Sequence, residues 1–418
     1  MTDARLRSIA SFPTSGTCSP RTISLIALIG VFLTLMPASA QQFTVLYSFK
    51  GGSDGARPWG GVIVDSAGNI YGTTAYGGSS QNCNQGGLGC GTVFKLSPSG
   101  KETILHRFGG KGDGSLPVGT LLQGSDGGFF GTTYNGPGPN GFSGVFFSLS
   151  RSGKEEILHT FAGGEGTNPL TGVIRDKQGN FFGDTYLGGA PHWYGTAYKL
   201  DPSGRTETVL HRFVCSTGCD PTGELVRDTE GNLYGTAEET VPKDSGTVFK
   251  LDKTGKQSIL YRFPADGSKG KLPFGVIRDQ AGNLYGTTLA GGNTCCGGGT
   301  VFELDSTGKE TVIYAFTGLH GDGALPLIGL VRDSQGNLYG TTWQGGYVCH
   351  LGGQQIGCGT VFKIDVTGKE TLLHVFKGDR DGQNPMYGPL FLDAAGNLYG
   401  TTQYGGDYNN GIVFRVNP

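Results

Sequence analysis

The chain has 418 residues, more than the roughly 250–300 at which one hydrophobic core usually stops growing, so it is divided into domains or built from repeats. Glycine supplies 78 residues and aromatic residues 11%, a mixture that excludes collagen, with glycine at every third position, and intrinsic disorder, which is poor in aromatic residues. A formal charge of −2 without a basic patch argues against a nucleic-acid partner.

The N-terminal segment has the pattern of an export signal. Three arginines precede the apolar run ISLIALIGVFLTLM (23–36), and the small-residue sequence PASA ends at Ala40. The run is shorter than the ~20 residues of a membrane span, although an uncleaved anchor is the alternative. We therefore predict a signal peptide over 1–40 and one folded domain over 41–418, secreted or periplasmic, with no membrane span after signal removal.

A short motif then recurs along the whole chain. Its seven copies are GNIYGTT (68–74), GGFFGTT (127–133), GNFFGDT (179–185), GNLYGTA (231–237) and GNLYGTT at 282–288, 336–342 and 396–402. Each of the first six copies lies in a unit with four pieces of alternating apolar and polar residues, rich in β-branched and aromatic types, which is typical of strands. Asp/Ser/Gly turns join these pieces, so we expect four antiparallel strands per unit.

The two ends of the repeat region complement each other. The last unit ends at GIVFRVNP (411–418) with only three strand pieces, whereas FTVLYSF (43–49) is a fourth-strand piece without a unit. We therefore predict an all-β, seven-bladed β-propeller with four antiparallel strands per blade, closed by the N-terminal strand 43–49 in the last blade. An open solenoid would leave both ends in need of caps.

The repeat pattern GNLYGTT…GG…GTVFKLD…GKET resembles the GloVer tandem repeat of bacterial exported proteins over essentially all of 43–418. More loosely, GVIVDSAGNIYGTT is similar to NHL and virginiamycin-B-lyase type propellers. The resemblance implies an exported propeller without an assigned chemistry. GloVer proteins commonly carry a C-terminal surface anchor; because this chain ends at Pro418, we expect a free form, and a monomer.

Residue types that recur at one repeat position are interpreted as structural, because a single site rarely needs seven equal copies. We expect the YGTT glycines to allow close approach by a neighbouring blade, and the prolines to precede each first strand. Aspartates of the DSAGN turns and DG loops are expected to cap turns, since calcium requires six to eight oxygens. One position is held by histidine or tyrosine, which argues against metal binding there: His106, His159, His211 and His374, and Tyr47, Tyr261 and Tyr314.

Eight cysteines follow the export segment, an even number that suits disulfides in an exported chain. Three pairs each bracket one loop: Cys83 with Cys90, Cys215 with Cys219, and Cys349 with Cys358. Cys295 and Cys296 are adjacent, so they form a strained vicinal bond or a link elsewhere. No CxxC knuckle occurs, so neither a metal nor another cofactor is predicted.

The loops between the second and third strands hold the candidate ligand-binding residues. They carry aromatic side chains among amides: Tyr76, Trp193, Tyr194, Trp343 and Tyr404. By analogy with other propellers, ligands bind on the face that these loops form. Aromatic faces beside amide groups would suit a glycan, and the alternative is that the rings only cover the blade ends.

Asp184 departs from the repeat, because the other six copies have threonine there. His192, His320 and His350 also fall outside the repeated set. An acid and a histidine within reach of each other could transfer protons, which makes Asp184 and His192 the catalytic candidates. No GxSxG, HExxH or P-loop motif supports catalysis. We therefore expect a non-catalytic binding or scaffold protein with a glycan or protein partner; the alternative is a propeller-type lyase or hydrolase.

Overall fold

A computed structural model describes residues 42–418 except 79–82, 84–87, 111, 138–142, 241–244, 293–297, 320, 328 and 352–353. The predicted signal peptide lies outside these residues. Within them, the helices are the short 3-10 turns η2 (Gly52–Asp54) and η3 (Asp379–Asp381), and neither is long or apolar enough to cross a membrane.

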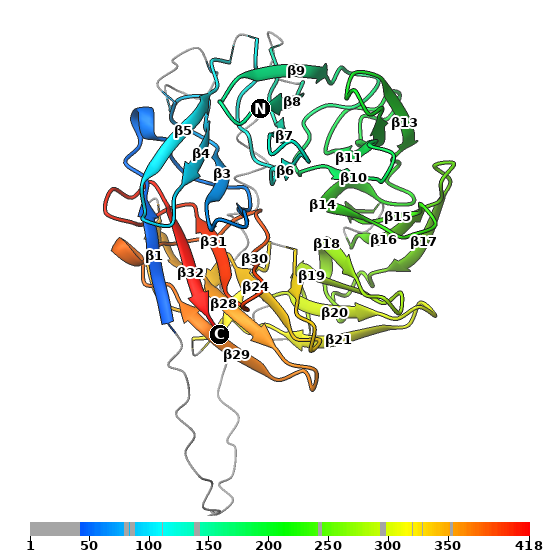
Figure 1. The fold of residues 1–418 in the computed structure, drawn as a ribbon. Helices are drawn as coiled ribbons and strands as arrows, with labels where there is room; N and C mark the ends of the chain where they lie inside the picture. The colour runs from blue at the N-terminus through cyan, green and yellow to red at the C-terminus, as the bar shows by residue number, and fades with distance from the viewer. Residues whose placement is uncertain are drawn as a thin grey trace, which may run out of the picture.

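Seven antiparallel sheets of four strands each stand around a ring, which confirms the seven-bladed propeller (Figure 1). Blades 1 to 3 are β2 (Ile63–Val64), β3 (Ile70–Thr74), β4 (Thr92–Leu96) and β5 (Glu102–Arg107); β6 (Leu122–Gln123), β7 (Phe129–Thr133), β8 (Val145–Leu149) and β9 (Glu155–Thr160); β10 (Ile174–Arg175), β11 (Phe181–Thr185), β12 (Thr196–Leu200) and β13 (Glu207–Arg212). Blades 4 and 5 are β14 (Cys219–Arg227), β15 (Leu233–Glu239), β16 (Thr247–Leu251) and β17 (Gln257–Arg262); β18 (Lys271–Arg278), β19 (Leu284–Ala290), β20 (Thr300–Leu304) and β21 (Glu310–Ala315).

Blades 6 and 7 complete the ring. They are β23 (Val331–Arg332), β24 (Leu338–Thr342), β28 (Thr360–Ile364) and β29 (Glu370–Val375); β30 (Phe391–Leu392), β31 (Leu398–Thr402), β32 (Ile412–Asn417) and β1 (Gln42–Ser48). Blade 6 also carries two small sheets that the repeat pattern did not predict: β22 (Gly323–Ala324) with β25 (Gln344–Gly345), and β26 (Val348–Leu351) with β27 (Gln354–Gly357). In every blade the first strand lies towards the centre of the ring and the fourth lies at its outer rim (Figure 1).

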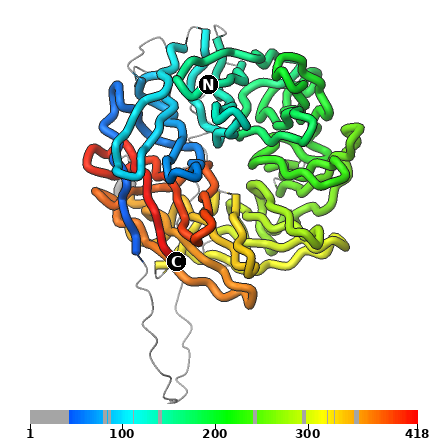
Figure 2. Tube along the Cα trace, viewed as in Figure 1, coloured from blue at the N-terminus to red at the C-terminus, as the bar shows by residue number. Residues whose placement is uncertain are grey.

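The N-terminal strand closes the ring, as the sequence predicts. β1 pairs antiparallel with β32, so that Gln42 lies opposite Asn417 and Ser48 lies opposite Ile412. Figure 2 shows this blue segment beside the red C-terminal segment. Because both ends of the chain share one sheet, the edge of β32 is covered and the last blade is complete.

The hydrophobic core lies between neighbouring blades. A phenylalanine after each fourth strand packs against a ring on the third strand of the next blade, with centroids 4.8–5.4 Å apart. The seven pairs are Phe49–Phe94, Phe108–Phe147, Phe161–Tyr198, Phe213–Phe249, Phe263–Phe302, Phe316–Phe362 and Phe376–Phe414. All of these rings are buried, so the same contact joins every blade to the next.

The YGTT glycines have a different role from the predicted one. A Cβ atom on Gly72 would lie 2.8 Å from Cζ of Phe94, so the ring that needs the space belongs to the same blade, and the prediction of a neighbouring blade is wrong. The neighbour is met by the glycine before the third strand: a Cβ on Gly91 would lie 2.5 Å from Cδ of Pro117 in the next blade.

The prolines lie next to the first strands with one difference from the prediction. In blades 4 and 5, Pro221 and Pro273 lie inside β14 and β18, which begin earlier than the first strands of the other blades. Their missing N–H groups are tolerated because each of these strands is the edge of its sheet.

We predict that Phe49→Ala lowers the free energy of unfolding by about 3–5 kcal/mol, the usual cost of removing a buried phenylalanine ring. The matched change Phe263→Ala, at the junction of blades 4 and 5, should cost a similar amount, and guanidinium denaturation measures both. A loss below about 1 kcal/mol for Phe49→Ala alone would mean that the N-terminal strand contributes little to closure.

Candidate functional site

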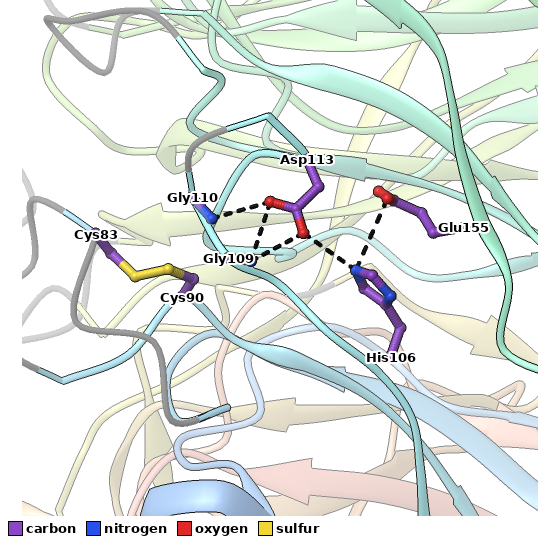
Figure 3. A network of polar contacts seen from close by, with 7 residues as sticks. All are labelled: Cys83, Cys90, His106, Gly109, Gly110, Asp113 and Glu155. Carbon is purple, nitrogen blue, oxygen red and sulfur yellow. Dashed lines mark hydrogen bonds and ion pairs between the residues drawn. A yellow bond between two sulfur atoms is a disulfide. The ribbon is translucent and has the colours of Figure 1, made fainter.

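A histidine with two acids lies at the junction of blades 1 and 2 (Figure 3). Nε2 of His106 lies 3.3 Å from Oδ2 of Asp113 and 3.8 Å from Oε2 of Glu155, the first residue of β9. The backbone N–H groups of Gly109 and Gly110 donate to the Asp113 carboxylate at 2.8–3.0 Å. Such a group has donor atoms that suit a metal ion, so its role has to be decided from the other blades.

The same arrangement recurs at six of the seven junctions of the outer rim, and we call it the rim belt: a histidine or tyrosine of a fourth strand facing acids of its own loop or of the next blade. The exception is His211 of blade 3, which faces Gln257 of the next blade. His159 lies 2.8 Å from Glu207, and His374 lies 3.1 Å from Asp381. Where the belt has tyrosine, the hydroxyl donates instead: Tyr47 to Asp54 at 2.7 Å, Tyr261 to Glu310 at 3.3 Å and Tyr314 to Glu370 at 3.0 Å. Both side chains supply a donor to a carboxylate, which explains why they exchange and supports a structural role.

Electrostatics in the belt follow from its partial burial. Burial alone would raise the pKa of Asp113, but the hydrogen bonds from His106 and Gly109 outweigh this effect, so its pKa lies below the usual value. Burial raises the pKa of Glu155 to about 7, and the nearby His106 only partly opposes it. At the closing junction Phe43 replaces the glutamate, and its ring stacks on His374 with centroids 3.6 Å apart.

The aspartates of the first-to-second strand turns are also structural. Asp65 accepts hydrogen bonds from the backbone N–H groups of Ala67 and Asn69 and from the Tyr71 hydroxyl, at 2.8–3.0 Å. Asp333 repeats this pattern with Gln335, Asn337 and Tyr339. Each carboxylate therefore closes its own turn, as the sequence predicts, and leaves few oxygens for a cation.

Disulfides join Cys83 to Cys90, Cys215 to Cys219 and Cys349 to Cys358. The first and third each tie a loop between a second and a third strand to the start of that third strand. The second joins the loop after β13 to the first residue of β14, where blade 3 has no belt aspartate. Cys295 and Cys296 lie outside the described residues.

Exposed apolar side chains concentrate on one face of the ring. We call this face, made by the loops that join second to third strands and fourth to first strands, the loop face. Of the eight large hydrophobic residues that are exposed in the described part of the chain, six lie in second-to-third strand loops: Leu88, Trp193, Tyr194, Tyr347, Val348 and Tyr408. Val366, by contrast, lies in a turn between a third and a fourth strand, on the opposite face.

The candidate aromatic residues divide into three groups. Trp193 is 54% exposed and Tyr194 39%, side by side in blade 3, and Tyr194 lies parallel to His192 with centroids 6.4 Å apart. Tyr76 and Tyr404 come from blades 1 and 7 and meet around the Arg57 guanidinium. Trp343 is only 6% exposed and packs in a cluster of buried residues with Leu272, Leu289 and Leu325, so it covers the blade ends.

Asp184 is buried in β11, and no histidine side chain among the described residues pairs with it. Oδ1 accepts a hydrogen bond from Thr171 at 3.2 Å, while Oδ2 has no hydrogen-bond donor among the described residues. His192 is exposed on its loop, His320 lies outside the described residues, and the side chain of His350 is also outside them.

Two further departures from the repeat surround Asp184, and the sequence analysis missed both. Tyr198 stands where the other blades have phenylalanine; it is fully buried, and its hydroxyl has no partner among the described residues. Glu224 extends from β14 towards blade 3, where a Cβ on Gly172 would lie 2.9 Å from its Oε1. Burial raises the pKa of Asp184, the Thr171 hydrogen bond opposes this, and the charge of Glu224 adds to it, so that the pKa is about 7.

We predict that His106→Tyr changes the free energy of unfolding by less than about 1 kcal/mol, because a tyrosine at this position supplies the same donor to Asp113. His106→Leu should cost about 1–3 kcal/mol, since it leaves two half-buried carboxylates without their partner. Urea denaturation measures both changes. Stabilisation of the wild type by added zinc that is absent in His106→Tyr would instead identify a metal site.

A second prediction concerns the stability cost of Asp184. Its folded-state pKa is raised, so the folded state binds the proton more tightly than the unfolded state, and stability is lost as pH rises from about 4 to about 7. Asp184→Thr restores the residue of the other blades and should stabilise the fold at pH 8 by on the order of 2 kcal/mol.

At pH 4 the gain from Asp184→Thr should be close to zero, because Asp184 is then largely protonated in the folded state. Thermal unfolding followed by circular dichroism at the two pH values makes this comparison. A variant that is less stable than the wild type at pH 8 would contradict the burial argument.

A family model matches almost the entire chain. The Gloeobacter/Verrucomicrobia repeat matches residues 28–170, 137–352 and 297–418, which confirms the resemblance that the repeat motif indicates. No curated protein matches the sequence.

Solved structures share the fold at low sequence identity. The extracellular domain of a putative one-component system from B. thetaiotaomicron is 13% identical with a TM-score of 0.53, over 89% of this chain and 39% of that one. An oligogalacturonate lyase from Vibrio parahaemolyticus is 10% identical with a TM-score of 0.53, over 91% of this chain and 94% of that one. At these identities the likeness concerns the propeller architecture alone, which hosts both sensor domains and enzymes.

Proposed function

Because the chain belongs to the Gloeobacter/Verrucomicrobia repeat family, and its exposed apolar side chains concentrate on the loop face, we propose that it is an exported, non-catalytic binding propeller. The partner is held on the loop face, and its class is a glycan. A protein partner is the alternative outcome of the test.

The concentration of exposed apolar side chains on the loop face carries this proposal. Single exposed hydrophobic residues are ordinary on protein surfaces, but a group confined to one face marks a binding surface. Trp193 and Tyr194 present neighbouring rings, and Tyr347 and Val348 present another apolar pair in blade 6. The Cys349–Cys358 disulfide fixes the second pair, which lowers the entropy that ordering the loop would cost on binding.

The chemistry of the loops favours a sugar over an apolar ligand. Aromatic rings cover the apolar faces of a sugar ring, and the amides and backbone groups of the glycine-rich loops supply donors and acceptors for its hydroxyls. The buried Trp343 adds to the floor of this face rather than to its contact surface.

Export is the second part of the proposal. Disulfides persist in oxidising compartments, so the three cystines support a secreted or periplasmic location. The signal peptide over 1–40 and a mature domain over 41–418 belong to this proposal. N-terminal sequencing of the exported protein tests both boundaries.

The buried acids Asp184 and Glu224 favour a second candidate function, that of a lyase or hydrolase. The pKa of Asp184 is raised to about 7, first by burial and then by the nearby charge of Glu224, so Asp184 would act as the base near neutral pH. Turnover of a bound polysaccharide by the wild type and its loss in Asp184→Asn would establish this function, whereas binding without turnover supports the non-catalytic one.

We predict that Trp193→Ala with Tyr194→Ala weakens binding of the protein to its polysaccharide at least tenfold, because about two rings of contact are removed. The mature domain is first screened on a glycan array, and affinities are then measured by isothermal titration calorimetry. The matched control is Val366→Ala, an exposed apolar residue on the opposite face, which should leave the affinity unchanged. Binding to no polysaccharide on the array would overturn the glycan proposal.

A further inference from the structure

We propose that Arg57, which contacts Tyr76 and Tyr404 at the junction of blades 1 and 7, is the receptor for a carboxylate group on the glycan. The inference rests on the proposed function and makes it more specific: the ligand class becomes a polysaccharide that contains uronic acids.

The side chain of Arg57 lies against two tyrosine rings. Cζ of Arg57 lies 5.3 Å from the ring centroid of Tyr76 and 5.0 Å from that of Tyr404. All three side chains are partly exposed at the loop face. Two tyrosine rings from different blades therefore contact one guanidinium group, and each contact is within the range of a cation–π interaction.

Arg57 differs from the residues at the equivalent positions of the other six blades. The residue before the proline of each blade has a positive φ of 53–60°, which places seven side chains at equivalent points around the ring. They are Arg57, Leu116, Asn168, Asp220, Leu272, Leu325 and Asn384, so Arg57 is the one cation among them.

The position of Tyr76 in the repeat also holds tyrosine in few blades. The residues equivalent to Tyr76 are Asn135, Leu187, Glu239, Ala290, Gln344 and Tyr404, each paired with the residue two places before the proline. Tyrosine thus occurs only in the two blades that flank Arg57. Arg57, Tyr76 and Tyr404 each differ from most of their equivalents in the repeat, and they lie together. This argues for a binding site rather than for random sequence variation.

The guanidinium of Arg57 has hydrogen-bond donors that no described residue uses. Arg107 and Arg262, at the rim, donate to the backbone carbonyl groups of Ser53 and Ser216. Within the described part of the chain, neither a carboxylate nor a carbonyl group accepts a hydrogen bond from the Arg57 side chain. The backbone is nonetheless fixed from both blades, because Arg57 N–H donates to Asn410 O at 2.7 Å and Ala75 N–H donates to Arg57 O at 3.1 Å.

A second unused donor lies close by. Trp59 stands edge-on to Tyr76 with centroids 5.5 Å apart, and it is only 6% exposed. Its indole N–H is buried and has no acceptor among the described residues.

A carboxylate is the ligand group that best matches the guanidinium of Arg57. The guanidinium presents parallel N–H groups that match the two oxygens of a carboxylate. The two tyrosine rings beside it make its surroundings less polar than water, which strengthens its attraction to an anion. On a face that suits sugars, the planar carboxylate of a uronic acid is the ligand that fits.

The test compares charged polysaccharides with neutral ones on the mature domain. Alginate, hyaluronate and polygalacturonate are each titrated beside their carboxyl-reduced, neutral forms, and a sulfated dextran provides a non-carboxylate anion. We expect the wild type to bind at least one uronate more than tenfold tighter than its reduced form.

Arg57→Asn is the informative variant, because Asn168 and Asn384 already occupy the equivalent positions, so the backbone conformation is retained. We expect this variant to lose the preference for the uronate while its affinity for the reduced form changes less than threefold. Arg57→Lys keeps the charge but not the two-pronged edge, and should retain only part of the preference. Thermal unfolding of each variant provides the folding control.

The outcomes separate this inference from the proposed function. Equal binding of charged and neutral forms by the wild type, a preference for the sulfated polymer, or an unchanged preference in Arg57→Asn would each overturn the Arg57 inference while glycan binding stands. Absence of binding to every polysaccharide would overturn both.

Discussion

The contact between the rings of one blade and the next determines the rest of this structure. No blade has a core of its own, since the phenylalanine that ends each fourth strand is buried only when the third strand of the following blade covers it. The glycine that precedes each third strand serves the same junction, because it lets the proline of the next blade approach closely. In a closed ring every blade has a neighbouring blade on both sides. The pairing of β1 with β32 completes the last blade and so provides the final junction.

Most of the fold could be predicted because it is repeated seven times. Strand number, turn positions and ring closure all follow from pattern and from the complementary ends of the chain. The error on Gly72 has a physical origin: the sequence shows that a side chain must be absent, but only coordinates show that the ring above it is Phe94 of the same blade. The rim belt could be judged structural from the exchange of histidine with tyrosine alone, although its acidic partners could not be identified.

The candidate sites were less predictable, because they depend on how neighbouring blades meet. Exposed Trp193 and buried Trp343 occupy similar loops in the sequence, and their different environments depend on the surrounding blades. Glu224 and Tyr198 were missed for a related reason: each differs from its repeat equivalents, but only the fold places them beside Asp184. A comparison of each position with its six equivalents in the repeat could have identified Glu224 and Tyr198 as exceptions, and it identifies Arg57 in the same way.

The position of β1 also has a consequence for how the protein is made. This strand is synthesised before all the others, and its partner β32 is synthesised last, so roughly 370 residues separate the two halves of one sheet. During export this half-apolar strand would stay without a partner until β30, β31 and β32 follow it. Until then both edges of β1 are open, and a chaperone that binds extended segments would bind there.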